Sequence, residues 1–169
     1  METIKAILTR RSIRKYSENI IPEEYYELLF KAAMHAPSGR NRQPWHFIIV
    51  NDRDRLNKLA EVSPSWKPLE TASSAIVVCG DLNIEDSESF IIQDCSAATQ
   101  NILLAAHETG LGSVWLGVHP REDRMKPLAE ILNIPDHIIP VSMVSLGKPG
   151  EDREQPDRYN IDRIHQDSW

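Results

Sequence analysis

The 169-residue sequence predicts an α+β sandwich formed by one folding domain. Helical and strand-like segments are mixed along the chain, but they lack the regular strand-helix alternation of a doubly wound fold. No Gly-x-Gly-x-x-Gly motif follows a predicted strand, which argues against a dinucleotide-binding fold of that class. No internal repeat divides the chain, and its length is sufficient for a single core.

The first third of the chain predicts two helices. Residues 2–9 favour a short helix with a small apolar face, and the basic residues 10–15 that follow are expected to be extended. From Tyr25 to Ala36, apolar side chains recur with the spacing of an amphipathic helix. Pro37 ends this second helix, because proline lacks the amide hydrogen that a helix interior needs.

Strands are predicted where short runs are apolar, β-branched or aromatic. Four segments have this composition: residues 46–50, 74–80, 113–118 and 141–147. We expect the first of them to be a buried strand that leads into a polar helix near residues 52–60. Four strands are enough for one sheet.

Two more helices are expected between the later strands. Residues 90–107 are apolar on nearly every side, and Gly110 and Gly112 are placed to end the helix. A helix of this kind has to be buried in a core or in an interface between chains. Residues 122–132 carry four apolar side chains on one face, which predicts a helix that covers the sheet.

The composition argues against several classes of function. With a formal net charge of −6, the chain lacks the basic character of nucleic-acid-binding proteins. No apolar stretch approaches the ~18 residues of a membrane span, and none at the N-terminus has signal-peptide length, so we expect a cytoplasmic protein. The six histidines and two cysteines show no metal-ligand spacing. We therefore expect no metal site, and buried thiols at Cys79 and Cys95.

Three motifs could carry chemistry. In the segment Arg10-Arg11-Ser12-Ile13-Arg14, an extended backbone would turn Arg10, Ser12 and Arg14 to one side, where two guanidinium groups and a hydroxyl suit a phosphate. The loop PSGRNRQP at residues 37–44 could read the polar edge of a flat ligand. Gly117 has no side chain, so the strand backbone around it could approach a planar cofactor closely. Taken singly, the motifs are equally compatible with a solvated basic linker, a helix-to-strand connector and a helix cap before a strand.

Taken together and in this order, the motifs resemble the nitroreductase family of FMN-dependent oxidoreductases in its short form. The resemblance rests on RRSIRKY near the start, APSGRNRQPW after the first long helix and GLGSVWLG after the apolar helix, and it extends into the tail from Asp157 to Trp169. It implies a mainly antiparallel central sheet flanked by helices, in an intertwined homodimer. One FMN-binding domain would span residues 1–169, with residues 150–169 as an extended C-terminal tail.

The resemblance also implies roles for individual residues around FMN. Arg10 and Ser12 would hold the phosphate, with Arg11 close to the same group. Arg14 would face the N1/O2 edge of the flavin ring, where a cation stabilises the charge of the reduced form. Arg158 is the expected second cation on the phosphate. Two other cations remain open for that role: Lys148 and Arg163.

The remaining cofactor contacts would come from the two later motifs. The loop would reach the FMN of the other subunit through four residues: Pro37, Ser38, Gly39 and Asn41. The backbone of Leu116 and Gly117 would contact flavin N5. The family more often has Pro-Ser-Ser in the loop, so Gly39 removes a hydroxyl and leaves the substrate contacts there open.

The implied function is a transfer of two electrons, by a ping-pong mechanism, from NADH or NADPH to a small acceptor such as a nitroaromatic or a quinone. No catalytic side chain is required, because flavin N5 performs the chemistry. Two other interpretations stay open: a flavin-binding module with a sensing or cofactor-handling role, and an anion-binding or structural dimer without flavin. The apolar helix at residues 90–107 independently favours burial against a second copy.

Overall fold

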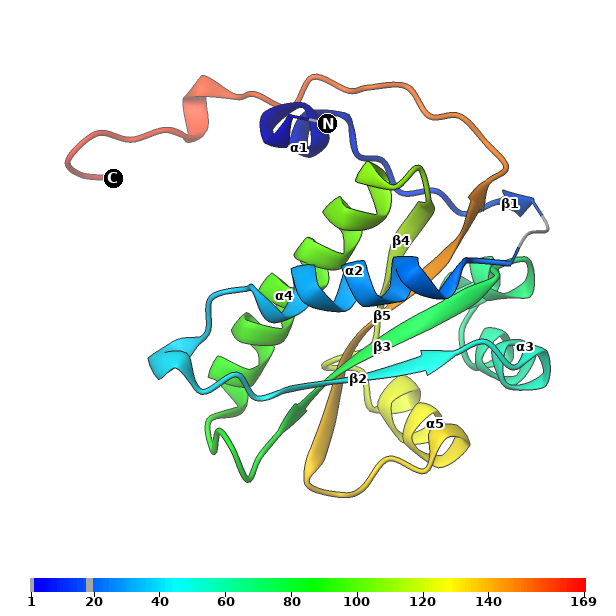
Figure 1. Ribbon diagram of the computed structural model, residues 1–169. Coiled ribbons are helices and arrows are strands. Elements are labelled where there is room, and N and C mark those ends of the chain that lie inside the picture. The colour runs from blue at the N-terminus through cyan, green and yellow to red at the C-terminus, as the bar shows by residue number, and fades with distance from the viewer. Residues whose placement is uncertain (1, 18–19) are drawn as a thin grey trace.

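A five-stranded sheet forms the centre of the protein, in a computed structural model that describes residues 2–17 and 20–169 (Figure 1). The strands follow the order β1-β5-β3-β2, and β4 pairs with β5 beside this path. All four strand pairs are antiparallel, which confirms the α+β class and the antiparallel sheet. The strand bounds are β1 Tyr16–Ser17, β2 Trp45–Val50, β3 Ser74–Asp81, β4 Gly112–Gly117 and β5 Ile138–Pro149.

Helices cover both faces of the sheet. The α-helices are α1 Thr3–Thr9, α2 Glu23–Met34, α3 Arg53–Val62, α4 Glu88–Glu108 and α5 Glu122–Leu132. Three short 3-10 helices are η1 Gly39–Asn41, η2 Pro64–Glu70 and η3 Ile161–Arg163. Figure 1 shows α2 and α4 crossing the sheet side by side, and their buried residues belong to one core cluster.

The central strand β3 explains the two-sided core. Ile76 and Val78 pack in the cluster formed with α2 and α4, whereas Ala75, Val77 and Cys79 pack in the cluster formed with α3, η2 and α5. Successive side chains of a strand point to opposite faces. The continuous apolar composition of this segment therefore reflects burial on both faces.

Two expectations about strands need correction. The run at residues 46–50 forms β2, but β2 lies at the edge of the sheet, and Ile49 is 39% exposed. It is not the buried strand that its composition predicted, because β-branched residues favour strands in general and do not distinguish an edge from a centre. The last strand is longer than expected, since β5 begins at Ile138 and ends at Pro149.

Both cysteines are buried, as expected. The pKa of Cys79 and that of Cys95 are each raised to about 12, mainly because burial disfavours the thiolate. Thiols of this kind are unreactive near neutral pH.

Within residues 2–17 and 20–169, none of the helices has both the length and the apolar character that a membrane crossing requires.

The chain beyond β5 leaves the body of the protein. Figure 1 shows this tail, orange to red, passing α1 before it reaches the C-terminus. It is exposed along almost its whole length and includes four large apolar side chains: Tyr159, Ile161, Ile164 and Trp169. On α1, the expected apolar face is also exposed, because Ile4, Ile7 and Leu8 find no cover in this chain among the described residues.

Candidate functional site

The basic segment at residues 10–14 is extended and runs beside the start of β4. Ser12 forms a parallel bridge with Ser113, and the Ile13 N–H donates to the Ser113 carbonyl at 3.0 Å. The Ile13 side chain packs against Gly112, where a Cβ would lie only 2.9 Å from Ile13 Cγ2. The hydrogen bond and this packing turn Ile13 toward β4.

Arg10, Ser12 and Arg14 line a common cavity of about 250 Å³, which we call the arginine pocket. Its other lining residues come from the same segment and from the tail: Arg11, Arg153, Glu154, Pro156 and Arg158. The pKa of Arg10 is lowered, first by burial and then by the guanidinium groups of Arg158 and Arg11. Because like charges gather in a half-buried cavity, a bound anion would relieve their repulsion.

Arg11 lines the arginine pocket, and its guanidinium also donates to backbone carbonyls at the end of α1, Leu8 at 2.9 Å and Arg10 at 2.6 Å. Its Nε also donates to the Glu154 carbonyl of the tail at 3.1 Å. In this structure Arg11 joins the end of α1 to the tail.

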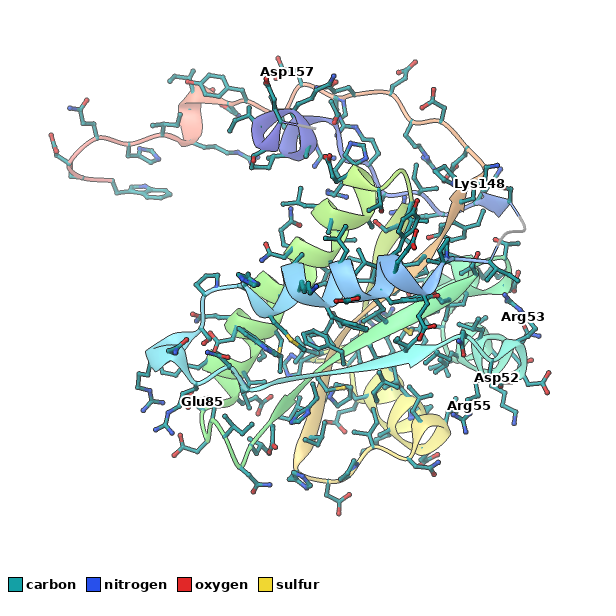
Figure 2. The ribbon with its side chains drawn as sticks, in the orientation of Figure 1. Asp52, Arg53, Arg55, Glu85, Lys148 and Asp157 are labelled. Atoms are coloured by element: carbon teal, nitrogen blue, oxygen red, sulfur yellow. The ribbon has the colours of Figure 1, made fainter. Side chains whose placement is uncertain are left out.

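The three cations considered for a second phosphate contact lie in different places. Arg158 lines the arginine pocket. Lys148 lies in β5 opposite Ser17, and Figure 2 shows it beside β1, well before the tail reaches Asp157 near α1. Arg163 lies further along the tail in η3. Geometry therefore favours Arg158.

A second cavity, of about 690 Å³, adjoins the first and is called here the β4 pocket. It is lined by residues 114–117 of β4, by parts of η2, and by Arg14, Arg124 and Arg153. Its volume is in the range of small-molecule sites. Arg14 and Arg153 line both cavities, so the two form one site with a cationic end and a larger end.

Gly117 lies at the wall of the β4 pocket. Its carbonyl accepts hydrogen bonds from Trp66 Nε1 at 3.2 Å and Arg124 Nη1 at 2.8 Å. A Cβ at Gly117 would meet only Arg124 Nη1, at 3.5 Å, among the described atoms within 4 Å. Packing within the chain therefore does not require a glycine here, and the open space suits a ligand that approaches the backbone closely.

The η2 helix was missed by sequence reasoning, although it forms a wall of the β4 pocket. Trp66 from this helix is completely buried. Ser63 precedes Pro64 and its side chain accepts from the Ser65 N–H at 3.4 Å, so it caps the helix. A cap residue followed by proline at the first helical position is a known start signal and could have revealed this element.

The loop before β2 lies away from both cavities of its own chain. Two buried acidic residues near the start of α4 hold it: the Gly39 N–H donates to Asp94 Oδ1 at 3.0 Å, and Arg40 Nη2 pairs with Glu85 at 2.7 Å. The structure thus does not bring this loop together with Arg10 within one chain. In Figure 1 the loop, with η1, lies near the opposite end of α4 from α1.

The same loop has an unusual backbone. Three residues other than glycine have left-handed φ values, Arg40 at 53°, Asn41 at 54° and Gln43 at 52°, which costs about 1–3 kcal/mol for each residue that does not favour this region. Such strain persists only where the surroundings hold it. The space of a side chain at Gly39 is occupied by Phe90, whose Cδ1 would lie 3.3 Å from a Cβ there.

Comparison with known proteins places the chain in a family. The family model described as "Nitroreductase family" matches residues 7–82 and 65–148. A protein of Archaeoglobus fulgidus named "Putative NADH dehydrogenase/NAD(P)H nitroreductase" is 53% identical over 172 residues, covering 99% of each chain. The chain belongs to the nitroreductase family, which confirms the resemblance of its motifs.

Solved structures agree with this assignment. A protein of Parabacteroides distasonis with the same name as the Archaeoglobus relative has a TM-score of 0.95 and 42% identity, covering 99% of this chain and 98% of that one. A protein of Clostridium difficile named "FMN-dependent Nitroreductase" has a TM-score of 0.91 and 30% identity, covering 98% and 99%. The fold is therefore that of the family over essentially the whole chain.

Proposed function

We propose that the protein is an FMN-dependent oxidoreductase that takes two electrons from NADH or NADPH and passes them to a small acceptor such as a nitroaromatic or a quinone. The observation that carries this proposal is the pair of adjoining cavities, one crowded with arginines and one bounded by the backbone of β4. An FMN molecule has the same two-part chemistry, with a phosphate at one end and a flat ring at the other. The names of the relatives support the choice of cofactor and donor.

The residues present fit FMN. Arg10 and Arg158 would hold the phosphate through their like charges, which share one cavity, and the Ser12 hydroxyl would add a hydrogen bond. The backbone of Leu116 and Gly117 would face the ring in the β4 pocket. When bound, FMN supplies a ring nitrogen that accepts and releases hydride.

The chain's own contribution is binding, orientation and electrostatics. Arg14 lines both cavities, so its cation would stabilise the negative charge of the reduced ring. No nucleophile or acid–base pair is needed for this chemistry. Donor and acceptor would use the β4 pocket in turn, which makes the kinetics ping-pong.

We further propose that the site is completed by a second copy of the chain. The loop residues Pro37, Ser38, Gly39 and Asn41 line neither the arginine pocket nor the β4 pocket of their own chain, and Asp94 holds the loop in place at Gly39. Large apolar side chains on α1 and on the tail are also exposed, and an interface with a second copy would bury them. An intertwined homodimer would satisfy both.

Spectroscopy of the purified protein tests the function. We expect a yellow protein with the absorbance of oxidised flavin near ~450 nm. Anaerobic NADH or NADPH should bleach it, and a nitroaromatic or quinone should restore the colour. A protein that purifies without flavin and cannot be loaded with FMN refutes the proposal. Bleaching without recovery, for every acceptor tried, supports a flavin-binding module with little turnover.

Mixing two inactive variants tests the shared site. One variant carries Arg10→Ala and Arg14→Ala, and the other has residues 38–41 replaced by alanines. After subunit exchange, each mixed dimer would contain one site built only from intact parts, so activity should return toward one site per dimer. A fully exchanged mixture that stays inactive contradicts the proposal, as does an active, flavin-loaded monomer in sedimentation.

A further inference from the structure

The first part of the tail, residues 150–154, is hydrogen-bonded to residues 11–15. The residues proposed above as phosphate ligands do not make these contacts from the tail. Three hydrogen bonds join the two segments: Gly150 N–H to the Lys15 carbonyl at 2.9 Å, Arg14 N–H to Glu151 Oε1 at 2.7 Å, and Arg11 Nε to the Glu154 carbonyl at 3.1 Å. These bonds span more than a hundred residues of sequence. They bring the tail arginines beside Arg10 and Ser12.

Glu151 lies at the centre of this arrangement. Its side chain is only 14% exposed. One carboxylate oxygen accepts from the Arg14 N–H, and the other pairs with Arg153 Nη2 at 3.0 Å. The hydrogen bond from the Arg14 backbone is the main reason that the pKa of Glu151 is lowered, so the carboxylate is charged at neutral pH. One acidic group therefore orients two residues of the site.

Arg153 occupies the junction of the two cavities. It lines both the arginine pocket and the β4 pocket, a position that it shares only with Arg14 among the described residues. Its ion pair with Glu151 uses one terminal nitrogen. A guanidinium has five N–H donors in a planar fork, so other donors remain for a ligand that passes through the junction.

We propose that Arg153 is a further FMN-binding residue, which contacts the phosphate end of the phosphoribityl chain, and that Glu151 is a positioning residue that aims it. This inference rests on the proposed function, because a cofactor with its phosphate in one cavity and its ring in the other has to cross the junction. Glu151 holds the Arg153 guanidinium there before the cofactor arrives. The arrangement reduces the ordering that binding would otherwise require.

Affinities for FMN and for riboflavin, which lacks the phosphate, test the inference. In Arg153→Ala we expect the Kd for FMN to rise about tenfold, as for a lost charge-assisted hydrogen bond, while the Kd for riboflavin changes by less than about twofold. Glu151→Gln keeps an acceptor for the Arg14 N–H but loses the ion pair, so FMN affinity should fall by roughly threefold. The double variant should match Arg153→Ala, because Glu151 acts through Arg153.

Arg55→Ala is the matched control. It also removes one positive charge, but Arg55 is exposed on α3, far from the tail in Figure 2, and should leave both affinities unchanged. Equal losses of FMN and riboflavin affinity in Arg153→Ala would indicate a purely structural role and overturn the inference. An unchanged FMN affinity would also overturn it, provided that Arg10→Ala weakens FMN. If Arg10→Ala leaves FMN binding intact as well, the proposed function itself fails.

Discussion

Replacing Arg10 with alanine tests the cationic end of the site most directly. Arg10 is half-buried in the arginine pocket, where burial first, and then Arg158 and Arg11, lower its pKa. Loss of a charge-assisted hydrogen bond to phosphate should weaken FMN binding by about 1.5–3 kcal/mol. Because the pocket is partly open to solvent, we expect the lower end of this range, which is roughly a tenfold rise in Kd.

The effect should also appear as a loss of FMN-dependent stability. At an FMN concentration of 100 times the original Kd, the ligand stabilises the folded state by about 2.7 kcal/mol, and a tenfold weaker Kd reduces this to about 1.4 kcal/mol. For a domain of this size the difference corresponds to roughly 3–5 °C in Tm. Without FMN, the variant should be no less stable than the original protein, because a repulsive charge has been removed.

Calorimetric titration with FMN measures the change in Kd. Thermal unfolding with and without FMN measures the change in Tm. Arg55→Ala serves as the control for a general loss of positive charge. The reasoning is refuted if Arg10→Ala keeps full FMN affinity. It is also refuted if the Tm of the variant falls by the same amount with and without FMN, because the residue would then act on folding and not on FMN binding.

Three further predictions concern individual side chains. Arg158→Ala should weaken FMN binding about as much as Arg10→Ala, whereas Lys148→Ala and Arg163→Ala should not; equilibrium dialysis decides among them. Arg14→Ala should lower the flavin reduction potential more than it lowers affinity, since its partner gains charge on reduction; a normal potential with much weaker binding would mean that Arg14 binds phosphate. Burial raises the pKa of Tyr16, so its contribution to stability is complete below about pH 10 and is lost as the pH rises further. In Tyr16→Phe, unfolding at pH 7 should cost about 1–3 kcal/mol less, and denaturant titrations should show a shallower decline at high pH.

Local patterns predicted those parts of the protein whose shape depends on near neighbours. The helix at residues 122–132 has the expected bounds, because its apolar spacing has a helical period and a left-handed Asn133 ends it. The basic segment is extended as expected, and Arg10, Ser12 and Arg14 line one cavity, although Arg11 lines it as well.

Contacts between distant segments could not be predicted, because no local pattern in the sequence indicates them. Glu151 follows β5 in an acidic stretch of the sequence, and nothing in that stretch indicates that it bonds to Arg14, 137 residues earlier in the chain. The edge position of β2 and the pairing of β1 with the end of β5 depend in the same way on which strands become neighbours. Composition can indicate a strand, but the order of strands is set by the packing of the whole core.

The tail connects the cofactor site to the proposed dimer, and this leads to a last prediction. The segment from Arg153 to Arg158 completes the arginine pocket, and the chain continues at once into the part of the tail that carries the four exposed apolar side chains, from Tyr159 to Trp169. A ligand that binds Arg158 restricts the motion of the chain at the start of this apolar segment. Less conformational entropy is then lost when the segment packs against a second copy. FMN should therefore tighten the dimer, and association should equally tighten FMN, because linkage is reciprocal. Sedimentation across a dilution series, with and without FMN, measures the effect, and Arg158→Ala should reduce it. A dimer dissociation constant that is the same in both conditions would show that protein contacts alone hold the tail.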